Sequence, residues 1–260
     1  MKPSMVAAML AGLVRKGLAP GTIRKVNDCA RTLFNSALRD GLVVTNPVTL
    51  AGRPSADRPK IDPLTPAELT RVIGAADTLS AGPLIALLAA TGMRVGEASA
   101  LDVTDYDATA GTLAITRTYS KRFGLGPPKS KHGTRTITVP IAARPFLRAA
   151  QGERTAGPLF VTGKGKRFIK SMVQRAFTRL LGRLGIARRV VHQLRHSVAT
   201  ALVAEGVPLA DVAKYLGDSV DTVVRTYLHA AGWDPGRAMD VILAPKSGRK
   251  VGKRSAADPA

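Results

Sequence analysis

Cysteine is nearly absent from this sequence, since Cys29 is the only one in 260 residues. A disulfide within the chain is therefore impossible, and a cluster of thiolate metal ligands is excluded. There is also no run of about 18 apolar residues, the length expected of a membrane-spanning helix. Residues 1–17 lack the charged start, the long apolar stretch and the cleavage site of a signal peptide. These absences predict a cytoplasmic protein with no membrane partner.

Acidic residues are also scarce, because 18 Asp and Glu stand against 39 Lys and Arg, which gives a formal net charge of +21. Such an excess favours a polyanionic partner, since Lys and Arg that neutralise phosphates release condensed counterions. A membrane surface is the second candidate, but no strongly amphipathic basic helix stands alone. We therefore expect a nucleic acid as the partner. A generally basic protein without such a partner is the remaining interpretation.

A nucleotide-binding motif is missing as well. Residues 163–167, Gly-Lys-Gly-Lys-Arg, have the composition of a phosphate loop but not its Gly-x4-Gly-Lys-Ser/Thr spacing. We interpret this segment as a basic turn that contacts the DNA backbone, and we expect no nucleotide partner.

The N-terminal part of the chain predicts two amphipathic helices. Apolar residues recur at helical spacing over residues 6–14, and Pro20 opens a second helical stretch that ends near Gly41. Residues 46–63 hold four prolines and a glycine, the composition of an exposed linker. Two helices make a poor core, so we expect them to pack on something else or to belong to a larger helical domain. The predicted organisation is a partial helical domain over 1–47, a linker over 48–63, a main domain over 64–245 and a basic, disordered tail over 246–260.

The main domain is expected to be mainly α with a small antiparallel β-sheet, an α+β fold. Thr65 followed by Pro66 and Glu68 has the pattern of a capped helix start. Residues 112–119 and 135–139 alternate and are rich in β-branched side chains, which predicts two paired strands. Helices are expected over 65–79, 83–91, 94–101 and most of 141–243.

Several residues in this domain could carry chemistry on a phosphate. His192 and Arg195 are three positions apart and share one face of a predicted helix, so both could approach one phosphate. The alternative is a surface helix with a satisfied histidine. His192 and His196 have the spacing of metal ligands, but the glutamate of a metalloprotease helix is absent, so we expect no zinc.

Two further segments supply an arginine and a tyrosine. A glycine turn delivers Arg94 to the start of a helix, with Glu97 one turn later. Tyr227 follows an amphipathic segment, and a tyrosine on an apolar helix face belongs more often to the core than to a catalytic site. Each segment alone is weak evidence of function.

Taken together, these residues resemble the tyrosine recombinase, or phage integrase, family. The segment Thr-Gly-Met-Arg94-Val-Gly-Glu97-Ala matches the first arginine box of the family. The second box is matched by His192-x-x-Arg195-His196, followed 32 residues after Arg195 by Tyr227. The resemblance covers roughly residues 60–245, and residues 18–47 resemble the end of the helical core-binding domain. It implies the tyrosine recombinase catalytic-domain fold, preceded by a short helical segment.

The resemblance also implies a mechanism. Tyr227 would attack the scissile phosphate of duplex DNA, form a 3′-phosphotyrosyl link and release a 5′-hydroxyl, after which a second strand's 5′-hydroxyl attacks. Arg94 and Arg195 would hold the non-bridging oxygens, and His192 would assist proton transfer or position the phosphate. Glu97 and His196 would support these residues. Strand exchange would need no metal, ATP or other cofactor.

A lysine on the β-hairpin would protonate the leaving oxygen. Lys129 fits best, because it lies in the Pro-Lys-Ser/Thr pattern of many integrases, and Lys131 is the reserve. A hairpin is a sensible place for an acid that must reach the phosphate only in the assembled complex. The alternative is that both lysines only contact the DNA backbone.

The chain departs from the family pattern in two places. Nine residues before the tyrosine the family has His or Trp, whereas this chain has Asp218. An ionised carboxylate would repel a phosphate, but it could orient an arginine or reach the Tyr227 hydroxyl, so we expect a modified site. The helical segment before the linker is also short, which predicts either a truncated product or a minimal enzyme that encircles DNA less completely.

Three functions remain open at this point. The first is a site-specific recombinase that acts on double-stranded DNA as a homotetramer, with a helix over 233–243 docked on a neighbouring subunit. The second is a truncated, catalytically impaired DNA-binding remnant of an integrase. The third is a related topoisomerase that nicks and reseals DNA as a monomer, so assembly on DNA separates it from the first.

Overall fold

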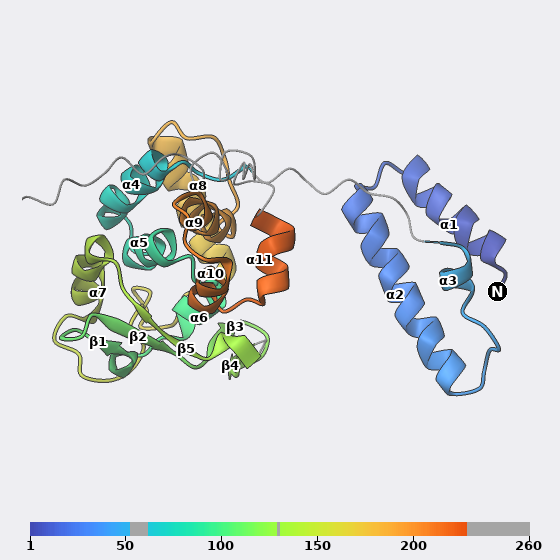
Figure 1. The fold of residues 1–260 in the computed structure, drawn as a ribbon, viewed down its shortest axis with the longest axis horizontal. Helices are drawn as coiled ribbons and strands as arrows, with labels where there is room; N and C mark the ends of the chain where they lie inside the picture. The colour runs from blue at the N-terminus through green and yellow to red at the C-terminus, as the bar shows by residue number, and fades with distance from the viewer. Residues whose placement is uncertain (53–61, 129–130, 228–260) are drawn as a thin grey trace, which may run out of the picture. The chain divides into compact units, whose positions relative to one another are not determined.

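The computed structural model describes residues 1–52, 62–128 and 131–227 (Figure 1). The chain divides into two compact units, Met1–Lys60 and Ile61–Ala260. The predicted helix over 233–243 and the predicted tail over 246–260 lie outside the described residues. None of the described helices combines the length and the apolar character needed to cross a bilayer.

Within residues 1–52, the first unit holds three helices, α1 (Pro3–Arg15), α2 (Pro20–Arg39) and α3 (Pro47–Leu50). Each begins with a proline, which suits the first turn of a helix because the missing N–H has no partner there in any case. Val6, Ile23 and Val48 form its small buried apolar centre.

Helix α3 overlaps the start of the predicted linker over 48–63, so residues 48–50 are helical and not linker. Asn46 is the N-cap of α3, and its side chain accepts from Val48 N at 2.9 Å and from Thr49 N at 3.3 Å. Its amide also donates to Arg31 O at 3.0 Å and to Asn35 Oδ1 at 2.7 Å. One buried side chain therefore caps α3 and fixes it to α2.

The second unit is built around α5 (Gly82–Thr91), which packs against five helices of the unit (Figure 1). Its apolar residues are buried on all sides, including Leu84, Ile85, Leu87 and Leu88. A helix that is apolar all round belongs in the middle of a core. The surrounding helices are α4 (Pro66–Gly74), α6 (Val95–Ala100), α7 (Arg144–Gln151), α8 (Lys170–Arg183) and α9 (Gln193–Ala204).

The predicted start of α4 is confirmed, because Thr65 and Glu68 form a reciprocal capping box. The helix ends at Gly74 and continues only as a 3₁₀ turn, η1 (Ala76–Thr78). Within the residues described up to 227, two more helices follow α9, and short 3₁₀ turns precede or follow several strands and helices. These elements are α10 (Leu209–Leu216), α11 (Val220–Tyr227), η2 (Val103–Asp105), η3 (Lys131–Gly133) and η4 (Ile141–Ala143).

The β-structure forms two small antiparallel sheets instead of the single one expected. One has the order β1-β2-β5, and the other pairs β3 with β4. The residues predicted as one strand over 112–119 divide after Ile115. Arg117, in the interruption, pairs with Asp102 at 2.8 Å and Asp105 at 2.6 Å, which turns this part of the chain toward η2. The strands are β1 (Tyr106–Asp107), β2 (Thr112–Ile115), β3 (Thr118–Ser120), β4 (Gly124–Gly126) and β5 (Arg135–Thr138).

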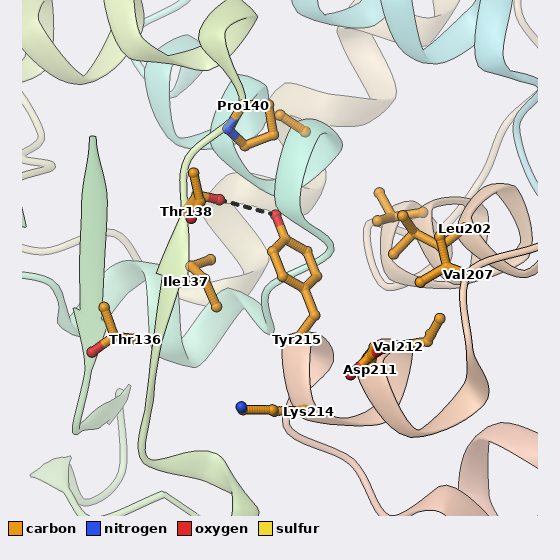
Figure 2. Close-up of a pocket in the computed structure, with 12 residues that line it drawn as sticks. Thr136, Ile137, Thr138, Pro140, Leu202, Val207, Asp211, Val212, Lys214 and Tyr215 are labelled. Atoms are coloured by element: carbon orange, nitrogen blue, oxygen red, sulfur yellow. Dashed lines mark hydrogen bonds between the residues drawn. The ribbon is translucent and has the colours of Figure 1, made fainter. Parts of the chain in front are cut away.

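Tyr215 is on α10, and its side chain points toward β5 and lines a cavity of about 450 Å³ (Figure 2). Its hydroxyl donates to Thr138 O at 3.4 Å, and burial raises its pKa to about 12, so it remains a donor at neutral pH. This contact holds the end of α10 against the sheet.

The basic turn over 163–167 is closed by a hydrogen bond from Thr162 N to Lys166 O at 2.8 Å. The side chain of Arg167 points into the protein, where it pairs with Asp102 and donates to Leu101 O at 2.9 Å. Lys164 and Lys166 stay exposed. Arg167 therefore stabilises the fold, whereas a DNA contact by Lys164 and Lys166 stays a prediction.

Replacing Asn46 tests the role of its side chain in the first unit. Asn46→Ala removes both the cap and the amide donor, so we expect the local unfolding free energy of α2 and α3 to fall by about 1–3 kcal/mol. Hydrogen exchange of the amides in residues 20–50, followed by mass spectrometry, measures this loss. Asn46→Asp is the matched control, because it keeps the cap acceptor and should lose less. Equal exchange in both variants and wild type would contradict the prediction.

Candidate active site

The turn between α5 and α6 delivers Arg94. Gly92 ends α5 with φ 67°, in the left-handed region that favours glycine. A Cβ at this position would lie 2.9 Å from a Leu216 side-chain atom and 3.1 Å from one of Val198. The glycine thus lets the turn approach α9 and α10 closely, and Arg94 follows as the N-cap residue of α6.

Asp218 bridges Arg94 and Arg195. Its Oδ2 lies 2.6 Å from Arg195 Nη2, and its Oδ1 pairs with Arg94 Nη2. Arg195 is only 2% exposed and also donates to Gly92 O at 3.0 Å and Leu216 O at 2.8 Å. One carboxylate therefore holds both arginines of the family boxes side by side. Of the two roles considered for Asp218, this arrangement matches the orientation of an arginine.

Glu97 extends the network on the other side of Arg94. The Glu97 carboxylate is buried and lies 2.8 Å from Arg94 Nη1 and 3.0 Å from Arg135 Nη2. Burial disfavours the charge on Arg94, but the hydrogen bonds and charges of Glu97 and Asp218 outweigh it and raise the pKa of Arg94. Arg94 is therefore a fixed, fully cationic group with a third of its side chain still exposed.

Arg135 was missed by the sequence analysis, although a signal for it exists. It alternates with Ile137 and Val139, both buried, so the period of two predicts that Arg135 faces inward as well. Its Nε donates to Tyr215 O at 2.8 Å. Gly217, with φ 73°, lets the chain pass close to this guanidinium, because a Cβ there would lie 2.5 Å from Arg135 Nη1. Arg135 thus joins the sheet to the segment that bears Asp218.

Tyr227 lies at the end of α11 with its side chain buried, 2% exposed. Its hydroxyl is 2.9 Å from His196 Nδ1, so its partner is this histidine and not Asp218. Burial raises the pKa of Tyr227 to about 12, a rise that the nearby charges of Arg195 and Arg94 oppose. The phenol is therefore protonated at neutral pH and lies within the electrostatic reach of both guanidinium groups.

His192, the N-cap residue of α9, and His196 in its first turn stack edge to face, with ring centroids 5.1 Å apart. Desolvation of its ring, together with positive neighbours such as Arg195 and Lys170, lowers the pKa of His192 to about 4, although the residue keeps contact with solvent. Burial and Arg195 also lower the pKa of His196. Both rings are therefore neutral at pH 7. Within the described part of the chain, no group of three or more His, Cys, Asp or Glu residues could hold a metal ion.

The predicted acid cannot be placed in this site. Lys129 lies outside the described residues, and so does the side chain of Lys131, the reserve candidate. The described backbone resumes at η3 and leads directly into β5, which carries Arg135.

The other residues that the sequence predicted for the site lie close together in the folded chain, although they come from different elements. Arg94 precedes α6 and His192 precedes α9, each as the N-cap residue, whereas Arg195 and His196 lie in α9 and Tyr227 ends α11. Two fixed cations, a phenol and a neutral base are the groups that transfer of a phosphodiester to a tyrosine requires.

Sequence comparison matches this chain to recombinases and integrases. A tyrosine recombinase XerC-like protein of Caldanaerobacter subterraneus subsp. tengcongensis is 26% identical over 88% of this chain and 68% of its own length. The integrase of Mycobacterium phage L5 is 29% identical over 89% of this chain and 64% of its own length. This chain thus spans about two thirds of each relative.

Solved structures match the fold. The Tn1549 transposon integrase in complex with a circular intermediate DNA has a TM-score of 0.79 and 21% identity, covering 94% of this chain and 85% of that one. A lambda integrase dimer bound to a COC′ core site has a TM-score of 0.64 and 20% identity, covering 90% and 67%. These likenesses confirm the predicted fold class, mainly helical with a small amount of antiparallel β-structure. The model of the phage integrase family matches residues 63–232. The chain therefore belongs to the phage integrase family.

Proposed function

We propose that this chain is a site-specific DNA recombinase that cleaves and rejoins duplex DNA through a 3′-phosphotyrosyl intermediate on Tyr227. The observation that carries the proposal is the contact between the buried phenol of Tyr227 and the neutral ring of His196. The guanidinium groups of Arg94 and Arg195, bridged by the carboxylate of Asp218, act on the same phenol. The net charge of +21 supports a DNA partner. The relatives are named recombinases and integrases, and the solved integrases are bound to DNA.

The attack by Tyr227 needs a base. With a pKa of about 12, only about one Tyr227 in a hundred thousand is ionised at pH 7. His196 Nδ1 accepts the proton as the Tyr227 oxygen bonds to phosphorus, and the bond from phosphorus to the 5′ oxygen breaks. Lys129, the predicted acid, protonates that leaving oxygen. In the reverse sense, a 5′-hydroxyl attacks phosphorus and the tyrosine leaves, so the phosphodiester energy is kept and no ATP is used.

Arg94 and Arg195 stabilise the negative charge that grows on the non-bridging oxygens. These oxygens need the same N–H groups that Asp218 occupies, because both Nη2 atoms point at its carboxylate. The phosphate therefore displaces Asp218 when it binds. His192, which keeps contact with solvent beside Arg195, then faces the incoming phosphate.

We infer that the active assembly on DNA is a homotetramer. Exchange between two duplexes breaks four strands, and each chain offers one nucleophile, Tyr227. A related solved structure is a lambda integrase tetramer bound to a Holliday junction. The predicted helix over 233–243 stays our candidate for the contact between neighbouring subunits. The convergence of Tyr227, Arg94 and Arg195 favours this enzyme over a remnant that only binds DNA.

Covalent trapping tests the proposal. A duplex nicked close to its cleavage site loses a short fragment after attack, so wild-type protein should give a protein–DNA adduct on a denaturing gel. Tyr227→Phe should abolish the adduct and keep DNA binding within about twofold, because only the nucleophilic oxygen is lost. Crosslinking on DNA separates a tetramer from a monomeric topoisomerase. An adduct formed by Tyr227→Phe would refute the assignment of the nucleophile.

The pH profile tests the role of His196. Because its pKa is lowered from 6.5, His196 stays a proton acceptor at pH 6.5, and the rate of adduct formation should be lost only as the pH falls further through the depressed value. Single-turnover rates between about pH 5 and pH 8 measure this. His196→Gln keeps a hydrogen-bonding side chain but cannot take the proton, so it should slow adduct formation by about 10²-fold or more. A rate equal to wild type would remove His196 from the mechanism.

Replacing Asp218 tests its competition with the phosphate. Asp218→Asn keeps the shape and removes the charge, so we expect adduct formation to speed up by about tenfold, equivalent to about 1.4 kcal/mol. The same change should lower the melting temperature, because it weakens a partly buried ion pair. Asp218→His restores the residue type of the family and should accelerate cleavage as well. Slower cleavage in both variants would mean that the carboxylate is needed during the reaction.

A further inference from the structure

A second cavity lies next to the proposed active site, with a volume of about 330 Å³. It is enclosed by the start of α6, by β3 with the turn after it, and by the start of α8. Val95 and Gly96, which line it, follow Arg94 directly in the chain. The other lining residues are Ser99, Tyr119, Ser120, Lys121, Ile169, Lys170 and Ser171.

Ser99 places a buried hydroxyl without a protein partner at this cavity. It is 2% exposed, and its Oγ makes no hydrogen bond within the described part of the chain. A buried hydroxyl without a partner destabilises a protein by about 1–3 kcal/mol, so such groups call for an explanation. A bound group with oxygen atoms would satisfy it.

The start of α8 makes the cavity suitable for an anion. This helix has 14 residues, its N-cap residue Ile169 makes no side-chain cap hydrogen bond, and its first turn has no acidic residue. The first N–H groups of a helix have no partner within it, and the helix dipole is positive at this end. Lys121 and Lys170 add two full positive charges. Backbone N–H groups, two ammonium groups and a hydroxyl form a phosphate-binding set.

The position relative to the catalytic residues indicates which phosphate this is. Val95 and Gly96 line the cavity directly after Arg94, and the charge of Lys170 contributes to the lowered pKa of His192, so the cavity adjoins residues of the proposed site. We propose that it binds a phosphodiester of the DNA backbone next to the scissile phosphate and thereby sets the register of the strand over Tyr227. This inference rests on the proposed function for its choice of DNA as the ligand.

DNA binding by a variant that cannot cleave DNA tests this proposal separately from the recombinase reaction. In the Tyr227→Phe background, Kd for a short duplex of arbitrary sequence is measured across a range of salt concentrations. Lys121→Met and Lys170→Met should each weaken binding by about 3–10-fold and reduce the salt slope by about 1. Both lysines serve one phosphate, so the double variant should lose clearly less than the product of the two single losses.

Arg148→Met is the matched control, because Arg148 is an exposed cation on α7, which does not line the cavity. It should leave Kd and salt slope nearly unchanged. Lysine variants that behave like this control overturn the proposal. If the lysine variants bind weakly as expected but the wild type forms no covalent adduct, the cavity proposal stands and the recombinase proposal fails.

Ser99→Ala separates a ligand from a structural defect. If the Ser99 hydroxyl binds a phosphate of the DNA, Ser99→Ala should keep or raise the melting temperature of the protein. The same variant should bind the duplex several-fold more weakly. Unchanged binding would exclude Ser99 from the site.

Protection from acetylation uses the wild-type protein and identifies the source of the phosphate. The duplex should protect Lys121 and Lys170, whereas inorganic phosphate at the same phosphate concentration should not. Protection by inorganic phosphate alone would mean that the cavity takes a free anion, which overturns a DNA contact.

Discussion

The carboxylate of Asp218 between two guanidinium groups is the interaction on which the proposed site depends. Arg94 and Arg195 repel each other, and Arg195 has almost no contact with water, so an anion between them is needed to keep them together. Asp218 supplies that anion without DNA, and the scissile phosphate supplies it in the proposed complex. The same carboxylate therefore maintains the site and competes with the substrate.

The surrounding network fixes this interaction to the rest of the unit. Glu97 joins Arg94 to Arg135, and Arg135 holds the carbonyl of Tyr215 shortly before Asp218 in the chain. Tyr215 in turn bonds to β5 through its hydroxyl. Helix α6, the sheet and the segment after α10 are thus connected through side chains, which keeps the spacing of the two arginines independent of flexible loops.

Much of this could be predicted from the sequence, because the informative signals are local. The cap at Thr65 and the glycine turn before Arg94 depend on neighbours within a few residues, and the order of the boxes indicated the family. The contact of His196 with Tyr227 and the ion pairs of Arg117 that divide the predicted strand were not predicted. They join residues that only the tertiary fold brings together, and no periodicity encodes them.

The burial of Tyr227 has a consequence for when DNA is cut. Tyr227 is 2% exposed and belongs to the core cluster, so its oxygen can reach a phosphodiester only after this end of α11 has moved. A permanently exposed phenol could attack any phosphodiester that the basic protein bound. In the proposed recombinase, the movement of α11 would therefore decide when cleavage begins.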